Sequence, residues 1–326
     1  MYREKDKRKR KKMQARDVVQ YVLQSPVNGI VFKTDRGGFR TRIRTGTDPK
    51  TKEPILETHT LKGISEEIKK VFFSSYDSRK TARHSSKPHV TQSNTNVYAT
   101  KTAKGASRKR SFKTFMSAKY TGMATGSRVH RELHAYTSIM NYAAYGSQNS
   151  EQRLRSFHDS LSLNNNSGGV HPCTRAVLEF MFKTAKWVPV AAEWCVGDVR
   201  HQLKHATQID VLAAPLDPNG NGIASQKIIL CELKTGYNDG SFLRGSGLMS
   251  HVYPPVPDAP INQAKLQLVM SAVMFCDTYN LKWTDVELYV IHCPSDVSRQ
   301  IDAVGYRVTE AEREAFVSAL KKCQLL

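Results

Sequence analysis

Two apolar runs separated by a turn-rich segment, residues 207–236, constrain the fold more than any other part of the chain. The first run carries Asp210, and the second, IILCELK, carries Glu232 and Lys234. Pro, Asn and Gly crowd the segment between them, which predicts two strands joined by a longer hairpin loop. Because the side chains of a strand alternate between its faces, we expect Glu232 and Lys234 to project together while Leu233 points away.

A buried strand rarely carries an acid and a base unless they are paired or bind something. If the two strands pair, Asp210 lies beside Glu232 at the end of the sheet. Two such carboxylates repel each other unless a cation neutralises them, and hard oxygen ligands suit Mg²⁺ or Mn²⁺. The plain alternative is a hairpin in which Glu232 and Lys234 form an ordinary ion pair near an exposed end.

The rest of the C-terminal part alternates helical and extended patterns. Helices are expected over 127–140, 171–185, 261–280 and 308–323, and strands over 187–197 and 286–293. Thr309 followed by Glu312 is typical of a capping box at the start of the last helix. This order, with the hairpin in its middle, predicts an α/β fold with a mixed central sheet flanked by helices.

The N-terminal third predicts a different organisation. We expect a disordered basic tail at 1–16, a small segment of uncertain structure at 17–76, a basic linker at 77–113 and a compact domain over 114–326. Within the small segment, RGGFRTRIRTG suits a strand or a hairpin that touches RNA or DNA, and Thr60 to Tyr76 suits an amphipathic helix. The run from Lys7 to Lys12 indicates a nuclear address or a nucleic-acid contact, and a merely solubilising tail is the alternative.

The net charge of the chain indicates which class of partner it binds. Its 49 Lys and Arg against 29 Asp and Glu give a net charge of +20, which favours a polyanion such as nucleic acid or an anionic membrane surface. No stretch is apolar for long enough to span a membrane, so we expect a soluble protein with no membrane partner. The six scattered cysteines form no CxxC pair, which indicates a reducing compartment and argues against a disulfide scaffold or a cysteine-bound zinc site.

Four features stand in the order found in a known superfamily. They are G-x-x-V-H-x-x-L at 126–133, an acid in a strand at Asp210, E-L-K at 232–234, and a helix that carries Gln267. This order resembles the PD-(D/E)XK nucleases, and within them the RecB-like exonucleases, the mitochondrial genome maintenance exonucleases in particular. The resemblance covers residues 115–326 and implies a restriction-endonuclease-like core with a basic, partly disordered N-terminal extension.

The resemblance also implies a metal site. Carried over residue by residue, His130 corresponds to the metal-ligand histidine of the RecB-like group, and Asp210 and Glu232 correspond to its two acidic ligands. The carbonyl of Leu233 is then a further ligand, and Mg²⁺ or Mn²⁺ is the implied ion. No small-molecule cofactor is expected.

Further residues follow from the same resemblance. Lys234 corresponds to the catalytic lysine, and Gln267 to the glutamine of a Q-x-x-x-Y helix that lies near the site and touches DNA. The tyrosine position of that helix is Ser271 here, which departs from the family pattern, and Gln263 one turn earlier is a second candidate for the contact.

Three more side chains are open candidates. Glu193 stands where related enzymes often carry an acid, Glu179 is the alternative on the preceding helix, and a structural role is open for each. Arg244, in the glycine-rich loop at 240–247, could grip phosphates or lie on an ordinary surface loop.

The expected function is therefore hydrolysis of DNA phosphodiester bonds, by an Mg²⁺- or Mn²⁺-dependent exonuclease of replication, repair or recombination that acts on single strands or duplex ends. One alternative is a structure- or sequence-specific endonuclease of the same fold. The other is a non-catalytic basic protein that binds nucleic acid. The basic N-terminus favours the nucleus, and the resemblance leaves the mitochondrion as the alternative.

Overall fold

The computed structural model describes residues 17–19, 31–33, 39–48, 51, 54–73, 124–137, 170–197, 205–216, 227–237, 240–245, 247–295 and 301–326. The expected basic tail at 1–16 and the expected basic linker at 77–113 lie outside these residues.

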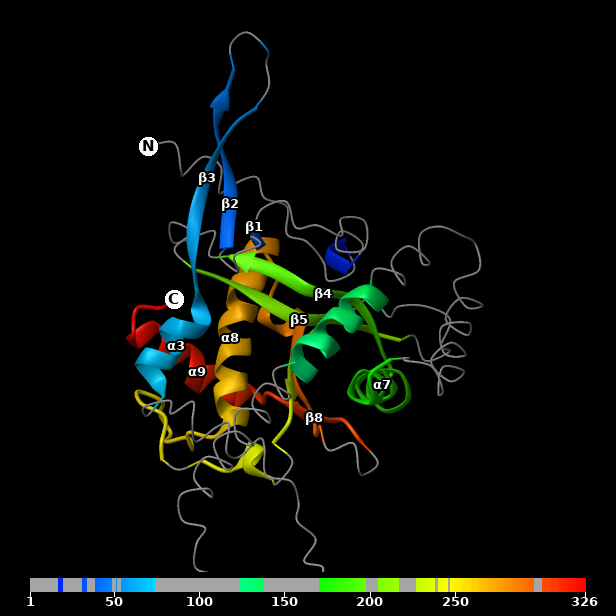
Figure 1. The fold of residues 1–326 in the computed structure, drawn as a ribbon. Coiled ribbons are helices and arrows are strands. Elements are labelled where there is room, and N and C mark those ends of the chain that lie inside the picture. Colours follow the sequence, from blue (N-terminus) through cyan, green and yellow to red (C-terminus); the bar gives the residue numbers. More distant parts are fainter. Residues whose placement is uncertain are drawn as a thin grey trace, which may run out of the picture.

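A mixed β-sheet runs through the described part (Figure 1). Its strands are β1 (Val31–Lys33), β2 (Phe39–Thr47), β3 (Pro54–Gly63), β4 (Trp187–Gly197), β5 (His205–Pro215), β6 (Ile228–Thr235), β7 (Val286–Cys293) and β8 (Val304–Arg307). Neighbours pair in the order β1-β2-β3-β5-β6-β7-β8, and β4 pairs with β5. The β3–β5 and β6–β7 pairs are parallel and the others are antiparallel, so the prediction of a mixed sheet is confirmed.

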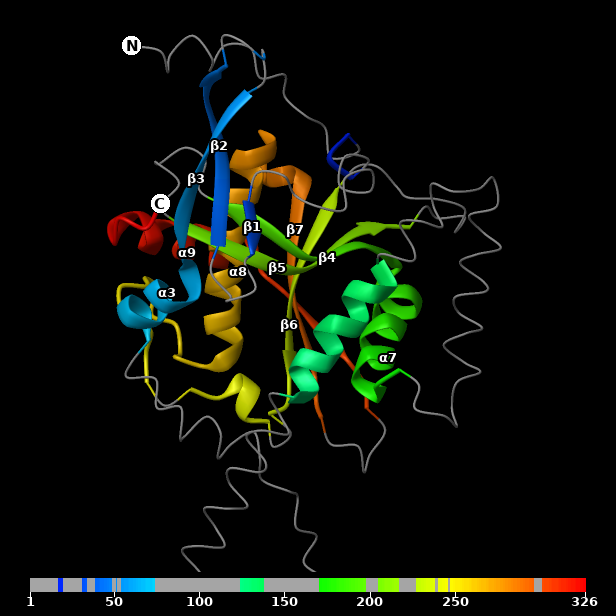
Figure 2. The ribbon, with the colours of Figure 1, turned by 45° about the horizontal axis from the view of Figure 1, so that its top comes forward.

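Helices cover both faces of the part of the sheet formed by β4 to β7. The helices are α3 (Ile64–Phe72), an α-helix over residues 124–137, α7 (Pro172–Glu179), α8 (Pro260–Tyr279) and α9 (Glu310–Lys322). Figures 1 and 2 show α3, α8 and α9 together on one side of these strands, and the 124–137 helix beside α7 on the other. The fold is therefore α/β, with helices flanking a central sheet.

The side chains of β6 show why both faces are covered. Ile228 and Leu230 belong to the apolar cluster that includes α8, whereas Ile229, Cys231 and Leu233 belong to the cluster that includes α7. Alternate side chains of a strand point to opposite faces, and all five are buried. A strand with this pattern is stable only between two layers of helices.

Local signals fix the helix ends. Pro260 occupies the first turn of α8, where its missing N–H costs nothing, and Asn280 ends the helix in the left-handed region with φ of 53°. At α9 the Thr309 side chain accepts a hydrogen bond from the backbone N–H of Glu312, and the Glu312 side chain bonds back to Thr309, so the predicted capping box is confirmed.

Three expectations about elements need correction. The helix expected from Thr60 begins only at Ile64, because residues up to Gly63 are held in β3 by their pairs with β2 and β5. The helix expected over 171–185 is α-helical to Glu179 and continues as a π-helix over Phe180–Ala185. Strands β1, β3 and β8 were not expected.

The described part also contains helical residues at 17–19, whose Val18 and Val19 are buried in the same apolar cluster as α8, and two 3-10 turns, Ser241–Leu243 and Trp283–Asp285. None of the helices in the described ranges is long and apolar enough to cross a membrane.

Candidate metal centre

The two acid-bearing strands pair as an antiparallel hairpin and then separate. The β5–β6 ladder joins Ala213 to Ile229 and Val211 to Cys231, and one step further the same register brings Asp210 opposite Glu232. There the Asp210 carboxylate replaces a ladder bond: its Oδ2 accepts a hydrogen bond of 2.7 Å from the backbone N–H of Leu233. The expected neighbourhood of the two acids is therefore present, at the point where the strands diverge.

A third acid and the histidine join Asp210 from other elements. His130, on the 124–137 helix, has its Nδ1 atom 2.5 Å from Oε1 of Glu193 on β4 and 3.7 Å from Oδ1 of Asp210. One ligand atom from each of these three residues lies within 4.8 Å of the others, and all three residues are half-buried. Three segments distant in the sequence thus converge on one small volume.

Glu193 reaches this position through an unusual backbone conformation. Its φ of 55° lies in the left-handed region, which a non-glycine residue in a strand rarely adopts. Its neighbours Ala192 and Trp194 pair with Val211 and Ile209 of β5, so Glu193 faces Asp210 across the two strands. The Gln208 side chain donates a hydrogen bond of 3.1 Å to the Glu193 carbonyl, which helps to hold this conformation. Backbone strain of this kind often marks a functional position.

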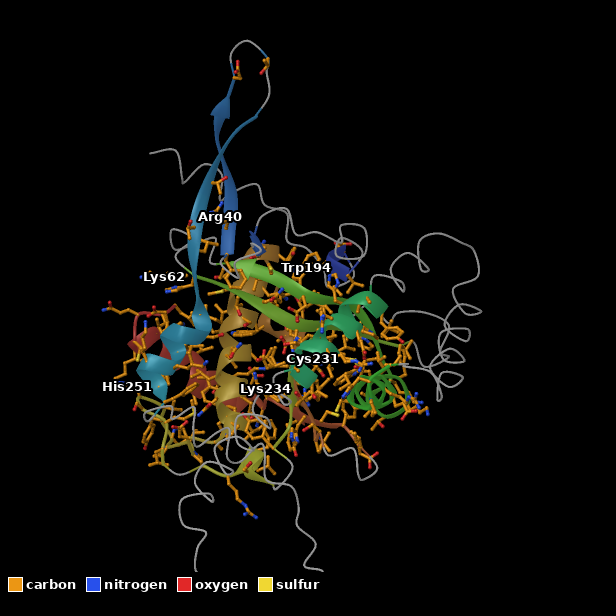
Figure 3. All side chains as sticks on the ribbon, viewed as in Figure 1. Arg40, Lys62, Trp194, Cys231, Lys234 and His251 are labelled. Carbon is orange, nitrogen blue, oxygen red and sulfur yellow. The ribbon has the colours of Figure 1, made fainter. Side chains whose placement is uncertain are left out.

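Glu232 and Lys234 lie on the same face of β6, as their spacing predicts. The Lys234 Nζ donates a hydrogen bond of 2.6 Å to Oε1 of Glu232. The Glu232 side chain is 3% exposed and that of Lys234 is 31% exposed, so the ammonium group reaches towards solvent from a buried acid. Figure 3 shows Lys234 towards the lower end of the sheet, below Cys231 on the same strand.

The charges in this cluster shift the pKa values of the residues that carry them. Burial and, next, the neighbouring charge of Glu232 raise the pKa of Asp210 to about 7, although the charges of His130 and Lys234 oppose this rise. Burial alone would lower the pKa of His130, but the hydrogen bond with Glu193 and the charge of Asp210 outweigh it and raise that pKa to about 9. Burial opposes the charge of Lys234 too, yet Glu232 and Asp210 raise the pKa of its ammonium group. At neutral pH, His130 and Lys234 are therefore protonated and positively charged.

The helix that carries His130 is fixed by Glu132. The Glu132 Oε2 accepts hydrogen bonds from the Thr174 hydroxyl at 2.6 Å and from the backbone N–H of His171 at 2.8 Å, both at the start of α7. Its Oε1 accepts one from Arg128 Nε at 2.7 Å. Burial opposes the charge of Glu132, but these hydrogen bonds lower its pKa. The dipole of α7 also favours a carboxylate at its N-terminus. Glu132 therefore fixes the 124–137 helix, and with it His130, against the start of α7.

The donor atoms around Asp210 fit a divalent cation. One imidazole nitrogen, carboxylates from Glu193 and Asp210, and the adjacent Glu232 are the ligand types that Mn²⁺ and Mg²⁺ accept. The charge of Glu232 is, after burial, the largest contribution to the raised pKa of Asp210, and a bound cation would relieve this repulsion. The sequence alone left the role of Glu193 open, and the structure places its carboxylate among the candidate ligand atoms.

The other candidates lie elsewhere or remain without an assigned role. Glu179, the last residue of α7, is half-exposed and pairs at 3.1 Å with Lys183 of the π-helix that follows. Gln263 donates a hydrogen bond of 2.7 Å to Asp258, at the start of α8. Gln267 is half-buried on α8, and its carbonyl accepts a hydrogen bond of 2.9 Å from buried Ser271. Arg244 is exposed at the end of the 3-10 turn.

Comparisons with known proteins identify no relative from which the function could be read. No family model matches the chain, and no curated protein matches it. A solved structure titled "Crystal structure of SSO0001" aligns with this chain at 15% sequence identity and a TM-score of 0.22. The alignment covers 64% of this chain and 88% of the chain in that structure. A likeness this weak carries no argument about fold or function.

Proposed function

We propose that this chain is an Mg²⁺- or Mn²⁺-dependent deoxyribonuclease with a restriction-endonuclease-like core of the PD-(D/E)XK type. The observation that carries the proposal is the convergence of His130, Glu193 and Asp210 beside the Glu232–Lys234 pair. An ordinary surface ion pair explains Glu232 and Lys234 but gives no reason for the other three residues to gather there.

The ligand set would come from four elements. His130, Glu193 and Asp210 would bind the ion from the 124–137 helix, β4 and β5, and β6 would add Glu232 and the carbonyl of Leu233. A bound divalent ion supplies Lewis-acid stabilisation of the phosphoryl oxygens and lowers the pKa of a coordinated water.

Lys234 would act as a fixed positive charge. Its raised pKa keeps the ammonium group protonated, so it can donate hydrogen bonds but cannot take a proton from water. Glu232 holds it at 2.6 Å, which directs the charge to where the negative charge of a phosphodiester grows in the transition state. Removing one such group typically costs about 10²- to 10³-fold in rate.

DNA is the proposed substrate, and exonucleolytic cleavage in replication, repair or recombination is the proposed activity. The net charge of +20 supports a polyanion substrate, and the position of His130 beside the acids supports the resemblance to the RecB-like group, on which the exonuclease assignment rests. The nuclear destination, with the mitochondrion as the alternative, stays a prediction, since residues 1–16 lie outside the described part.

The test is degradation of end-labelled single- and double-stranded DNA with Mg²⁺, Mn²⁺ or EDTA. We expect metal-dependent degradation by the wild type and a loss of about 100-fold or more in the Asp210→Asn and Lys234→Met variants. Glu179→Gln is the matched control, because it removes a carboxylate charge from the exposed face of α7.

Full activity in both site variants would refute the assignment of the site. Cleavage of closed circular DNA would indicate the endonuclease alternative, since a strict exonuclease leaves a closed circle intact. Salt-sensitive binding without cleavage in either metal would indicate the non-catalytic alternative.

A further inference from the structure

The β2–β3 hairpin extends away from the rest of the sheet. Its two strands pair from Phe39 opposite Leu61 to Thr47 opposite Pro54, and β1 pairs only with the Phe39 end of β2. On the other edge, β3 meets β5 only through its last residues, Lys62 and Gly63. Figures 1 and 2 show both strands continuing as a narrow two-stranded ribbon beyond the helices. We call residues 39–63 the arm.

The sequence of the arm is basic and regularly spaced. Strand β2 has arginine at positions 40, 42 and 44, and the register places these opposite Thr60, Thr58 and Leu56. Because successive residues alternate faces, positions 40, 42 and 44 share one face of the ribbon. Arg40, Lys62, Thr58 and Thr60 are exposed. Figure 3 shows Arg40 part-way along the ribbon and Lys62 nearer α3.

The composition of the arm selects among anionic partners. The arm has one Phe and no Tyr or Trp, and its Phe39 packs against the cluster of Leu61, Cys195 and Ala206, so no Phe, Tyr or Trp ring stands beside the arginines for the bases of a single strand to stack on. A two-stranded ribbon fits the major groove of a duplex, and arginine and threonine side chains bind phosphate oxygens. We propose that the arm binds the backbone of duplex DNA and guides it to the metal centre.

The distances agree with about one turn of duplex. From Ala206, the partner of Gly63, β5 advances four residues to Asp210, or about 13 Å. From Gly63 back to Leu56, opposite Arg44, β3 spans seven residues, or about 23 Å. Placed end to end, these segments give at most about 36 Å, and one turn of B-DNA measures about 34–36 Å. The inference rests on the proposed function and adds its substrate: a duplex held about one turn from the cut.

The test is DNA binding by fluorescence anisotropy in EDTA, where no cleavage is needed for a signal. The full-length triple variant Arg40→Gln, Arg42→Gln, Arg44→Gln is compared with the wild type on duplexes of about 30 and about 8 base pairs and on a single strand. We expect the variant to bind the long duplex at least about tenfold more weakly at about 0.1 M salt, and its log–log salt slope to fall by about 2 to 3. A duplex of about 8 base pairs, about 27 Å long, cannot extend from the metal centre to Arg44, so its affinity should fall less than that of the long duplex.

The control variant Lys183→Gln, Lys321→Gln, Lys322→Gln removes the same charge from exposed positions of the π-helix and α9. The inference is overturned if the control loses as much affinity, if the arm variant keeps the wild-type affinity and salt slope, or if single-strand binding falls as much as duplex binding. Since none of these readings involves catalysis, they separate a failure of the arm from a failure of the nuclease assignment.

Discussion

Binding of Mn²⁺ to the candidate centre should release protons, and the number follows from the site. A histidine or carboxylate must lose its proton before it can bind a metal. With a pKa of about 9, His130 is about 0.99 protonated at pH 7, and with a pKa of about 7, Asp210 is about half protonated. We therefore expect the wild type to release about 1.5 protons per Mn²⁺ at pH 7, and its affinity to rise about 15-fold between pH 7 and pH 8.

Isothermal titration calorimetry measures this release from the dependence of the binding enthalpy on the ionisation enthalpy of the buffer. In the His130→Ala variant the imidazole proton is no longer released, so the release should fall to about one proton or less. Glu179→Gln should behave as the wild type, because Glu179 forms an exposed ion pair with Lys183 of the π-helix, outside the ligand set. Mn²⁺ binding with no proton release, or with equal release in the wild type and His130→Ala, would refute the ligand set.

Three further predictions concern stability. In EDTA, the folded-state pKa of His130 lies above its ordinary value of 6.5, so its contribution is complete below pH 6.5 and lost as the pH rises towards 9. The melting-temperature advantage of wild type over His130→Ala should shrink over that range, as measured by scanning fluorimetry. Lys265→Met removes the 2.6 Å ion pair with Glu312 between α8 and α9 and should cost about 2 kcal/mol in urea unfolding; a loss near zero would contradict a structural role for the pair. Glu132→Gln should cost about 1 kcal/mol at pH 7, and the difference should disappear as the pH falls below 4.5, because its hydrogen bond with Thr174 helps to lower the pKa of Glu132.

The acid-bearing hairpin could be predicted because its signals are local. The alternation of side chains sets which residues of β6 face the same way, and the turn-rich segment before it forces an antiparallel partner. These two facts predict that Asp210 lies near Glu232 if the strands pair, and the register of β5 and β6 in the structure places them opposite each other. The capping box at Thr309 is equally local, since both of its hydrogen bonds form within one helical turn.

Glu193 could be noticed but not assigned, because its role depends on a backbone distortion. A glutamate inside the apolar run of β4 is visible in the sequence, yet simple alternation does not tell which face it takes. Its φ of 55° changes its direction locally and brings it to His130. No neighbouring residue predicts this conformation, because the position is not a glycine, the residue that adopts positive φ most readily.

Long-range pairings could not be predicted either. Local periodicity says nothing about which strands meet, so the parallel contact of β3 with β5 has no signal in the sequence. Strand β8 has only four residues, and its exposed and half-exposed side chains lack an apolar alternation. The helix expected from Thr60 was placed too early for the same reason, since the pairs of residues up to Gly63 override the helical pattern.

The contact between β3 and β5 lies on the same edge of β5 as the contact between β5 and β6. Ala206 pairs with β4 on one edge and with β3 on the other, and Val211 pairs with β4 on one edge and with β6 on the other. Strands β3 and β6 therefore share the same edge of β5, and Asp210 lies between them. Strand β3 occupies that edge at His205 and Ala206, and β6 leaves it after Cys231. The Asp210 Oδ2 then accepts the hydrogen bond of the freed N–H of Leu233, while its Oδ1 lies 3.7 Å from Nδ1 of His130, which Glu193 reaches from β4 at the other edge of β5. The N-terminal hairpin is therefore joined to the same edge of β5 as β6, four residues along the strand from Asp210.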